Sequence, residues 1–207
     1  MSGAVIIGAG PGIGQAVARR FAGEGLPMAL IARSDRTLRA AAEAVARSGV
    51  PVVTLQADST DQAGLNAALD EVVREHGVPD VVVYNAAIIQ ADAPGELSVR
   101  GHLEAWAVNV VGALNAAAHV APAMAARGNG TILITGGMPE PKPQYVSLSL
   151  GKAGGPAGVH VASITVAGPV APGTDFDPDD IAEHYWRLHM QPRHRWTREA
   201  LHAGSPR

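Results

Sequence analysis

Short apolar segments rich in β-branched residues alternate along this chain with longer alanine-rich segments, and this alternation constrains the fold more than any other feature. Two of them, AVIIG and DVVVYN, are apolar at consecutive positions rather than at every second one. Strands buried on both faces have this pattern, because helices cover both sides of a parallel sheet. The expected strands are Ala4–Gly8, Met28–Ala32, Val52–Ala57, Asp80–Asn85, Thr131–Thr135 and His160–Val166.

Charged residues at helical spacing and a closing glycine indicate helices between these strands. The expected helices are Gly12–Gly25, Arg36–Ser48, Asp61–His76, Val99–Arg127 and, before an irregular C-terminal tail, Asp179–His189. This order predicts a doubly wound parallel sheet of the Rossmann-like type, in a three-layer α/β/α arrangement. Because the chain has 207 residues, 47% of them hydrophobic, and no linker or internal repeat, we expect a single domain over residues 1–207.

Composition argues against several functions. The formal net charge of −3 gives no basic surface for nucleic acid. There is no cysteine, and the spacings of His184, His189, His194 and His202 match no compact metal motif, so no metal is expected. We expect these histidines in a solvated or subunit-facing tail. Since we find neither a targeting signal nor an uninterrupted apolar run long enough for a membrane, we expect a cytoplasmic protein without a membrane partner.

The motif GAGPGIG follows the first expected strand directly. It fits the spacing G-x-x-x-G-x-G through Gly8, Gly12 and Gly14, with Ile13 between the last two glycines. Glycine at these positions tightens the turn and lets backbone N–H groups approach a pyrophosphate at a helix N-terminus. The alternative is an ordinary glycine-rich turn, but the position at the first strand-to-helix junction favours dinucleotide binding.

The end of the second strand bears on the choice of dinucleotide. It runs into ARSDRT, where Arg33 and Ser34 are the first polar residues and Asp35 lies one step further. An acid at this strand end holds the ribose 2′-OH of NAD, whereas an arginine accommodates the 2′-phosphate of NADP. We therefore expect NADP in preference to NAD. Alternatively, Arg33 is a solvated cation and Asp35 caps the next helix.

Further motifs occur in an order that resembles the short-chain dehydrogenase/reductase superfamily. LQAD ends at Asp58, where the family has an acid that contacts adenine, and YNAA places Asn85 and Ala86 at its N-N-A-G motif. Asn109 lies where the family has an asparagine on helix four. ITVAGPV, ending at Val170, is similar to the segment that meets the nicotinamide carboxamide. The resemblance implies hydride transfer between a nicotinamide dinucleotide and a small carbonyl or alcohol, in a homodimer or homotetramer.

The chain departs from this family at the residues that transfer protons to and from the substrate. The family uses a serine together with Y-x-x-x-K, but the tyrosine position before Lys152 is Leu148, and the serine position is Gly137, preceded by Gly136. Tyr145 precedes Lys152 by two helical turns, or ~10 Å along a continuous helix, which is too far for a direct hydrogen bond. It would participate only if a loop before the helix folded it back toward the site.

Two functional interpretations therefore stay open. The ordered cofactor motifs, Asn109 and Lys152 favour an oxidoreductase, with Tyr145 as a further catalytic candidate and Lys152 also contacting the cofactor. The residues Leu148 and Gly137 instead favour a divergent, catalytically impaired protein that binds the cofactor for regulation or scaffolding.

A second departure follows Lys152. The family has a long crossover helix here, but Gly154, Gly155 and Pro156 oppose a helix, and the next strand begins soon afterwards. Either the helix is shortened or residues are missing between positions 153 and 158. Because an uncovered apolar sheet face is unfavourable by ~25 cal/mol per Å², we favour the second explanation.

Overall fold

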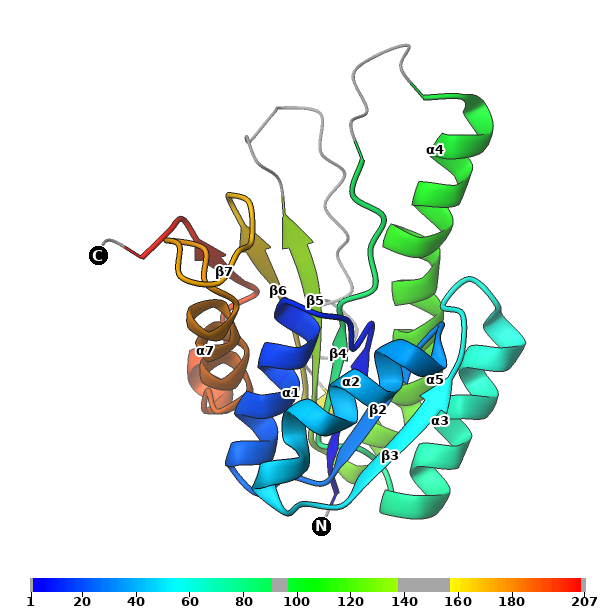
Figure 1. Cartoon of the computed structure of the whole chain (residues 1–207). Coiled ribbons are helices and arrows are strands. Elements are labelled where there is room, and N and C mark those ends of the chain that lie inside the picture. The colour runs from blue at the N-terminus through cyan, green and yellow to red at the C-terminus, as the bar shows by residue number, and fades with distance from the viewer. Residues whose placement is uncertain (1, 91–96, 138–156, 206–207) are drawn as a thin grey trace.

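One parallel sheet of seven strands organises the part of the chain that this computed structural model describes, residues 2–90, 97–137 and 157–205 (Figure 1). Its strand order is β3-β2-β1-β4-β5-β6-β7. The chain reverses its direction of travel across the sheet between β1 and β4, and ligands of such sheets bind at this switch point. The strands are β1 (Ala4–Ile7), β2 (Met28–Ala32), β3 (Val52–Gln56), β4 (Val81–Tyr84), β5 (Gly130–Gly137), β6 (Val159–Val166) and β7 (Glu199–His202).

Helices cover both faces of the sheet, as Figure 1 shows. Helices α1, α2 and α7 pack on one face, and α3 and α5 pack on the other. The doubly wound Rossmann-like fold expected from the sequence is therefore confirmed. The helices are α1 (Ile13–Gly23), α2 (Asp35–Val45), α3 (Gln62–His76), α4 (Val99–Trp106), α5 (Gly112–Arg127) and α7 (Pro178–His189), with short 3₁₀ turns η1 (Ala46–Ser48) and η4 (Arg193–Arg195).

The strand β1 shows why the central strands are apolar at every position. Ala4 and Ile6 point into the core beneath α1, α2 and α7, whereas Val5 and Ile7 point into the core beneath α3 and α5. All four are at most 1% exposed. Because neither face meets water, hydrophobic burial of about 1.5–3 kcal/mol per large side chain stabilises the strand from both sides.

The expectation of an irregular C-terminal tail is wrong. After η4, residues Glu199–His202 form β7, which pairs in parallel with β6 from Ser163 to Val166. The strand is short and contains no β-branched residue, so its sequence carries little propensity for a strand. Pairing with the edge of β6 supplies the hydrogen bonds that local sequence does not predict.

A continuous helical segment links α4, the π-helical turn η2 (Ala107–Val111) and α5. Among the described residues it is the one helix whose length and composition would allow a membrane span. Gly112 and Pro122 interrupt its apolar residues, so the sequence alone did not indicate a membrane span there. Its residues Ala113, Val120 and Met124 are buried in the core with the sheet, and a core helix satisfies the same criterion.

The connection between β5 and β6 lies between Gly137 and Val159. The two strands are parallel, so this connection crosses from one end of the sheet to the other. The expected shortening or gap near residues 153–158 lies mostly outside the described residues.

Candidate functional site

The turn after β1 brings the glycine motif against β4. Gly8 has φ +89°, and a Cβ added there would lie 2.4 Å from the backbone nitrogen of Ala86. Gly12 has φ +92°, with nothing within 4 Å of an added Cβ. Gly8 is therefore required by both conformation and crowding, whereas Gly12 is required by conformation alone and faces open space. An open concave turn of this kind is what a phosphate needs.

Helix α1 begins directly at this turn. An added Cβ on Gly14 would lie 2.3 Å from the carbonyl oxygen of Gly8, so only glycine lets the helix pack this closely. The first backbone hydrogen bonds are those of Gln15 and Ala16, which donate to Gly10 and Gly12.

Within the described residues, the N–H groups of Gly12, Ile13 and Gly14 have no backbone acceptor. The first turn of α1 carries no acidic residue and no side-chain cap. Free donors and the helix dipole therefore favour an anion here.

Asn85 fixes the orientation of this turn through its side chain. Its Nδ2 donates to the carbonyl oxygen of Gly8 at 2.9 Å, while its Oδ1 accepts from the hydroxyl of Thr135 on β5 at 2.9 Å. The Thr135 hydroxyl also lies 2.6 Å from the phenolic oxygen of Tyr185 on α7. Because Thr135 uses its one proton for Asn85, Tyr185 must donate to Thr135. The glycine turn is thus tied to the C-terminal helix.

Tyr185 is the site-linked residue that sequence reasoning missed. Its side chain is fully buried, and this burial raises the pKa of the phenol far above its usual value, so it remains a donor. The signal in the sequence was weak, since Tyr185 is one aromatic residue within an amphipathic helix. The hydrogen bonds from Tyr185 to Thr135 and from His189 to Thr131 show that α7 lies against β5.

The ends of β2 and β3 carry the charged groups nearest this turn. Asp35 pairs with Arg39 at 2.6 Å, and Ser34 caps α2, so the alternative in which Asp35 caps this helix is wrong. The guanidinium of Arg33 is exposed and has no ion pair among the described residues. Thr60 donates two hydrogen bonds to Asp58, and these, together with the charge of Arg33, hold the pKa of this carboxyl below its usual value.

Asn109 lies in the π-helical turn η2, and its amide is engaged by the backbone of the loop after β4. Its Oδ1 accepts from the Ile88 N–H at 2.8 Å, and its Nδ2 donates to the Ile88 carbonyl at 2.9 Å. The Tyr84 hydroxyl donates to the carbonyl of Val108 at 2.5 Å, and Gly112 leaves room for this hydroxyl. Asn109 therefore holds the loop that follows Asn85.

The carboxyl end of β5 has backbone but no hydroxyl where the sequence comparison placed serine. An added Cβ on Gly137 would lie 3.1 Å from the carbonyl oxygen of Val166 on β6, a tight contact, whereas one on Gly136 would have ordinary contacts. Thr135, just before them, points toward Tyr185 instead. Tyr145, Leu148 and Lys152 lie outside the described residues, so their predicted roles stay predictions.

The segment after β6 is held beside β7. The N–H of Ala167 donates to the carbonyl of His202 at 3.0 Å, and Gly168 leaves room for the ring of Phe176. Val170, which the sequence placed beside a nicotinamide, is 38% exposed on this segment.

The C-terminal histidines are mostly internal, which corrects the expectation of a solvated tail. His202 is 3% exposed, accepts from His184 at 3.1 Å and faces the carbonyl of Asp175 at 2.9 Å. His189 lies 3.0 Å from the Thr131 hydroxyl. Burial lowers the pKa of both His184 and His189. Among the residues described, no group of three or more metal-ligating side chains occurs.

Comparison with known proteins identifies the family. A family model described as short chain dehydrogenase matches residues 2–154, well over half of the chain. The chain belongs to the short-chain dehydrogenase family. The family binds nicotinamide dinucleotides, and one solved structural neighbour is a metagenomic short-chain oxidoreductase in complex with NADP. The predicted family is thereby confirmed.

Individual curated relatives share about a third of their residues with this chain in the aligned parts. A short-chain type dehydrogenase/reductase of Sinorhizobium fredii, y4mP, is 30% identical over 185 residues, which cover 86% of this chain and 69% of that protein. The probable oxidoreductase EphD of Mycobacterium tuberculosis is 37% identical over 132 residues, 60% of this chain but 21% of that protein. Indeed, the chain spans only 10% to 21% of the first curated relatives.

Among solved structures, an alcohol dehydrogenase of Thermococcus sibiricus complexed with 5-hydroxy-NADP is 26% identical. It aligns with a TM-score of 0.80 over 97% of this chain and 95% of that one. A short-chain dehydrogenase of Rhodopseudomonas palustris, 22% identical, shares the fold with a TM-score of 0.84 over 97% of both chains. The fold of this short-chain dehydrogenase thus extends over nearly the whole chain.

Proposed function

We propose that this short-chain dehydrogenase binds NADP(H) and transfers a hydride between it and a small carbonyl or alcohol. The observation that carries the proposal is the glycine turn at the sheet switch point. Its N–H groups at Gly12, Ile13 and Gly14 are free for a pyrophosphate, and no acidic side chain competes with that anion in the first turn of α1. When bound, the dinucleotide supplies or accepts the hydride.

The remaining groups fit the rest of such a ligand. Among the described residues, Thr60 engages Oδ1 of Asp58, which leaves the second carboxylate oxygen to accept from an adenine amine. At the other end, the backbones of Ala86 and Val170 flank the carboxyl edge of β4 and β6, where we place the nicotinamide.

The preference for NADP rests on two side chains at the end of β2, one of which is in an ion pair among the described residues and one of which is not. Asp35, the acid that would hold a ribose 2′-OH, is paired with Arg39. The exposed guanidinium of Arg33 is available for a 2′-phosphate, which it can bind through two charge-assisted hydrogen bonds.

A second candidate function is favoured by one observation, the absence of hydroxyl side chains at Gly136 and Gly137. On this alternative the chain binds the dinucleotide for regulation or scaffolding and does not turn it over. Loss of general acid–base assistance typically reduces rates by ~10²–10⁴-fold, which would leave hydride transfer slow. The two candidates therefore differ in turnover and agree in binding.

The test separates binding from turnover. NADPH is titrated by fluorescence, and single-turnover oxidation is then followed with cyclohexanone, acetoin, diacetyl, benzaldehyde and phenanthrenequinone. Binding with carbonyl-dependent oxidation that Lys152→Ala abolishes supports the oxidoreductase, whereas binding without any oxidation supports the alternative.

Two alanine substitutions in the same helix provide the control for binding. Gly14→Ala should weaken NADPH binding at least about tenfold, because the new Cβ forces α1 away from Gly8. Gly23→Ala is the matched variant, since an added Cβ there meets nothing within 4 Å, and it should bind as the wild type does. Equal affinity in both variants would refute the proposed pyrophosphate position.

We also propose that the chain forms a homodimer or homotetramer. The support is a row of apolar side chains on α4, where Val99, Leu103 and Trp106 are 77%, 64% and 48% exposed at helical spacing. A second copy would remove this row from water.

A further inference from the structure

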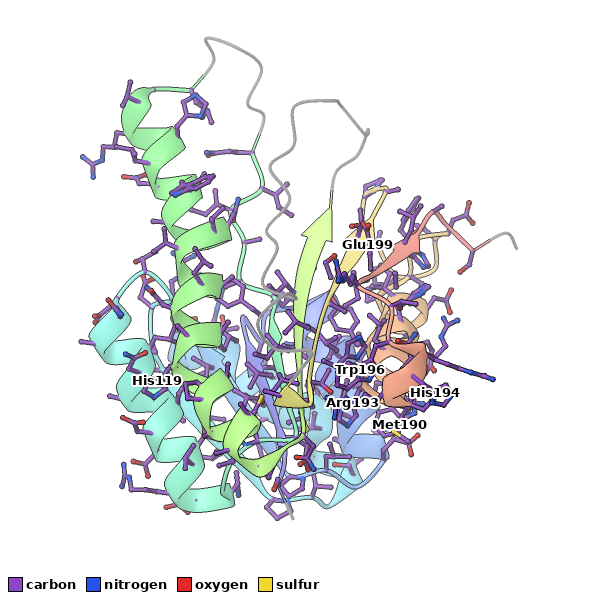
Figure 2. The ribbon with its side chains drawn as sticks, turned by 180° about the vertical axis from the view of Figure 1, so that it is seen from behind. His119, Met190, Arg193, His194, Trp196 and Glu199 are labelled. Carbon is purple, nitrogen blue, oxygen red and sulfur yellow. The ribbon has the colours of Figure 1, made fainter. Side chains whose placement is uncertain are left out.

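A hydroxyl and a carboxylate meet at the sheet edge without a role in the function proposed above. The hydroxyl of Thr165 on β6 donates to Oε1 of Glu199 on β7 at 2.6 Å. Ser163 pairs with Glu199 in the strand register, so Thr165 and Glu199 are diagonal neighbours. Glu199 is exposed and begins β7, the edge strand of the sheet, and Figure 2 labels its position. An exposed diagonal pair of this kind stabilises a sheet only weakly.

This pair lies opposite Gly136, one residue before Gly137, the position that lacks the family's serine. Thr165 pairs with Gly136 across β5 and β6, and an added Cβ on Gly136 would lie 3.8 Å from the Thr165 hydroxyl oxygen. The other atom near that added Cβ is the carbonyl oxygen of Ile164, and Gly136 itself has no side chain to cover Thr165. The neighbouring strand thus brings a hydroxyl to within van der Waals contact of a Cβ at position 136.

Gly136 and Thr165 face the side of the sheet that carries α3 and α5. Ile132 and Ile134 on β5 pack with the core on that side, and Gly136 continues their alternation. Val161 on β6 packs with the same core, and Thr165 lies four residues further along the strand. The hydroxyl of Thr165 is therefore at the carboxyl edge of the sheet, where a dinucleotide would present its nicotinamide.

We propose that Thr165 and Glu199 handle the proton in this site, an inference that rests on the proposed oxidoreductase function. In alcohol oxidation, the substrate hydroxyl transfers its proton to Oγ1 of Thr165, and the Thr165 proton moves to the carboxylate of Glu199. The substrate carbon gives its hydride to the oxidised nicotinamide dinucleotide, and a carbonyl forms. In carbonyl reduction, both transfers run in reverse: protonated Glu199 gives its proton to Thr165 as Thr165 gives its own to the substrate oxygen. The Glu199 carboxylate then takes a new proton from water.

The hydrogen-bond directions agree with this relay. A hydroxyl has one proton and two acceptor lone pairs, and Thr165 gives its proton to Glu199. Its lone pairs therefore point elsewhere and can accept from a substrate hydroxyl. Thr165 is the catalytic residue in this scheme, while Glu199 acts through it as a positioning residue. A substrate with its own carboxylate would be repelled by Glu199, so the pair favours neutral alcohols and carbonyls.

The experiment uses the full chain, with NADPH and whichever carbonyl of the panel above the wild type reduces fastest. Thr165→Val should lower kcat at least about 100-fold, and Thr165→Ser should stay within about fivefold of the wild type. Glu199→Gln should lower kcat to a similar degree, and the double variant should fall no further than the slower single variant, because the two residues act as one unit.

Two matched controls and one rescue separate this role from a structural one. Thr54→Val on the edge strand β3 and Glu75→Gln on α3 replace exposed residues elsewhere and should leave kcat unchanged. The Kd for NADPH should not change in any of these variants. Added formate should restore part of the rate of Glu199→Ala, because a small carboxylate can replace the missing side chain only if its charge takes up the proton.

Each result decides the question. Wild-type rates in Thr165→Val and Glu199→Gln would overturn the relay while leaving the oxidoreductase function intact. NADPH binding without reduction of any panel carbonyl by the wild type would overturn both. Loss of NADPH binding in Thr165→Val, with no effect on kcat in Glu199→Gln, would also overturn it by showing that Thr165 only supports the fold.

Discussion

The hydrogen-bonded chain from Tyr185 through Thr135 to Asn85 predicts that Tyr185→Phe lowers stability in the wild type but raises it in the Thr135→Val variant. Tyr185→Phe removes the donor to Thr135 and leaves the bond from Thr135 to Asn85 in place. Only one hydrogen bond is lost and no buried donor is stranded. The free energy of unfolding should therefore fall by about 1 kcal/mol.

Thr135→Val is more damaging because it strands two partners. The fully buried phenol of Tyr185 loses its acceptor, and Oδ1 of Asn85 loses its donor. An unsatisfied buried polar group costs about 1–3 kcal/mol, so we expect a loss of about 3 kcal/mol in total. Adding Tyr185→Phe to Thr135→Val then removes a stranded hydroxyl and should raise stability by about 1 kcal/mol.

Urea denaturation of the wild type, both single variants and the double variant measures this cycle. The NADPH affinity should follow the same order, with Thr135→Val weakening binding about fivefold, since Asn85 then holds the Gly8 carbonyl with one anchor fewer. Tyr84→Phe is the control, because that buried hydroxyl donates to Val108 and not to Asn85. The reasoning is refuted if Tyr185→Phe destabilises both backgrounds equally, or if Tyr84→Phe couples to Thr135→Val as strongly.

Three shorter predictions follow from charge and exposure. Arg33→Ala should raise the Kd for NADPH at least about tenfold and leave the Kd for NADH within about twofold, as measured by fluorescence titration. Burial lowers the pKa of His189, so the unfolded chain binds a proton that the folded chain does not; unfolding free energy should fall as pH drops below about 6.5, and His189→Asn should flatten that slope in urea titrations. Leu103→Glu should lower the mass measured by light scattering to that of a monomer, and an unchanged mass would exclude the α4 surface from the interface.

The sequence predicted most of the sheet because its central strands are buried on both faces. Strands such as β1 and β4 contain only residues that such burial selects, so their pattern does not depend on which neighbours they pair with. Strand β7 has the opposite character. Its residues alternate from exposed to buried at the sheet margin, and pairing with β6 rather than intrinsic propensity makes it a strand.

The site was predictable where backbone conformation determines the residue, and not where distant side chains meet. Gly8 and Gly14 were identified because no other residue fits those positions. Tyr185 and Glu199 come from elements whose place in the sheet is set by long-range topology, so their hydrogen bonds to Thr135 and Thr165 leave no local pattern.

The missing hydroxyl at Gly137 has a physical correlate in the pairing of β5 with β6. These strands pair over eight residues, up to Gly137 opposite Val166, whereas β1 and β4 pair over four. At the last pair, a Cβ on residue 137 would come within 3.1 Å of the Val166 carbonyl oxygen, closer than most side chains tolerate. Extended pairing therefore disfavours a side chain at residue 137. Thr165 pairs with Gly136, one residue before that position, and is the nearest hydroxyl that β6 brings to this end of β5.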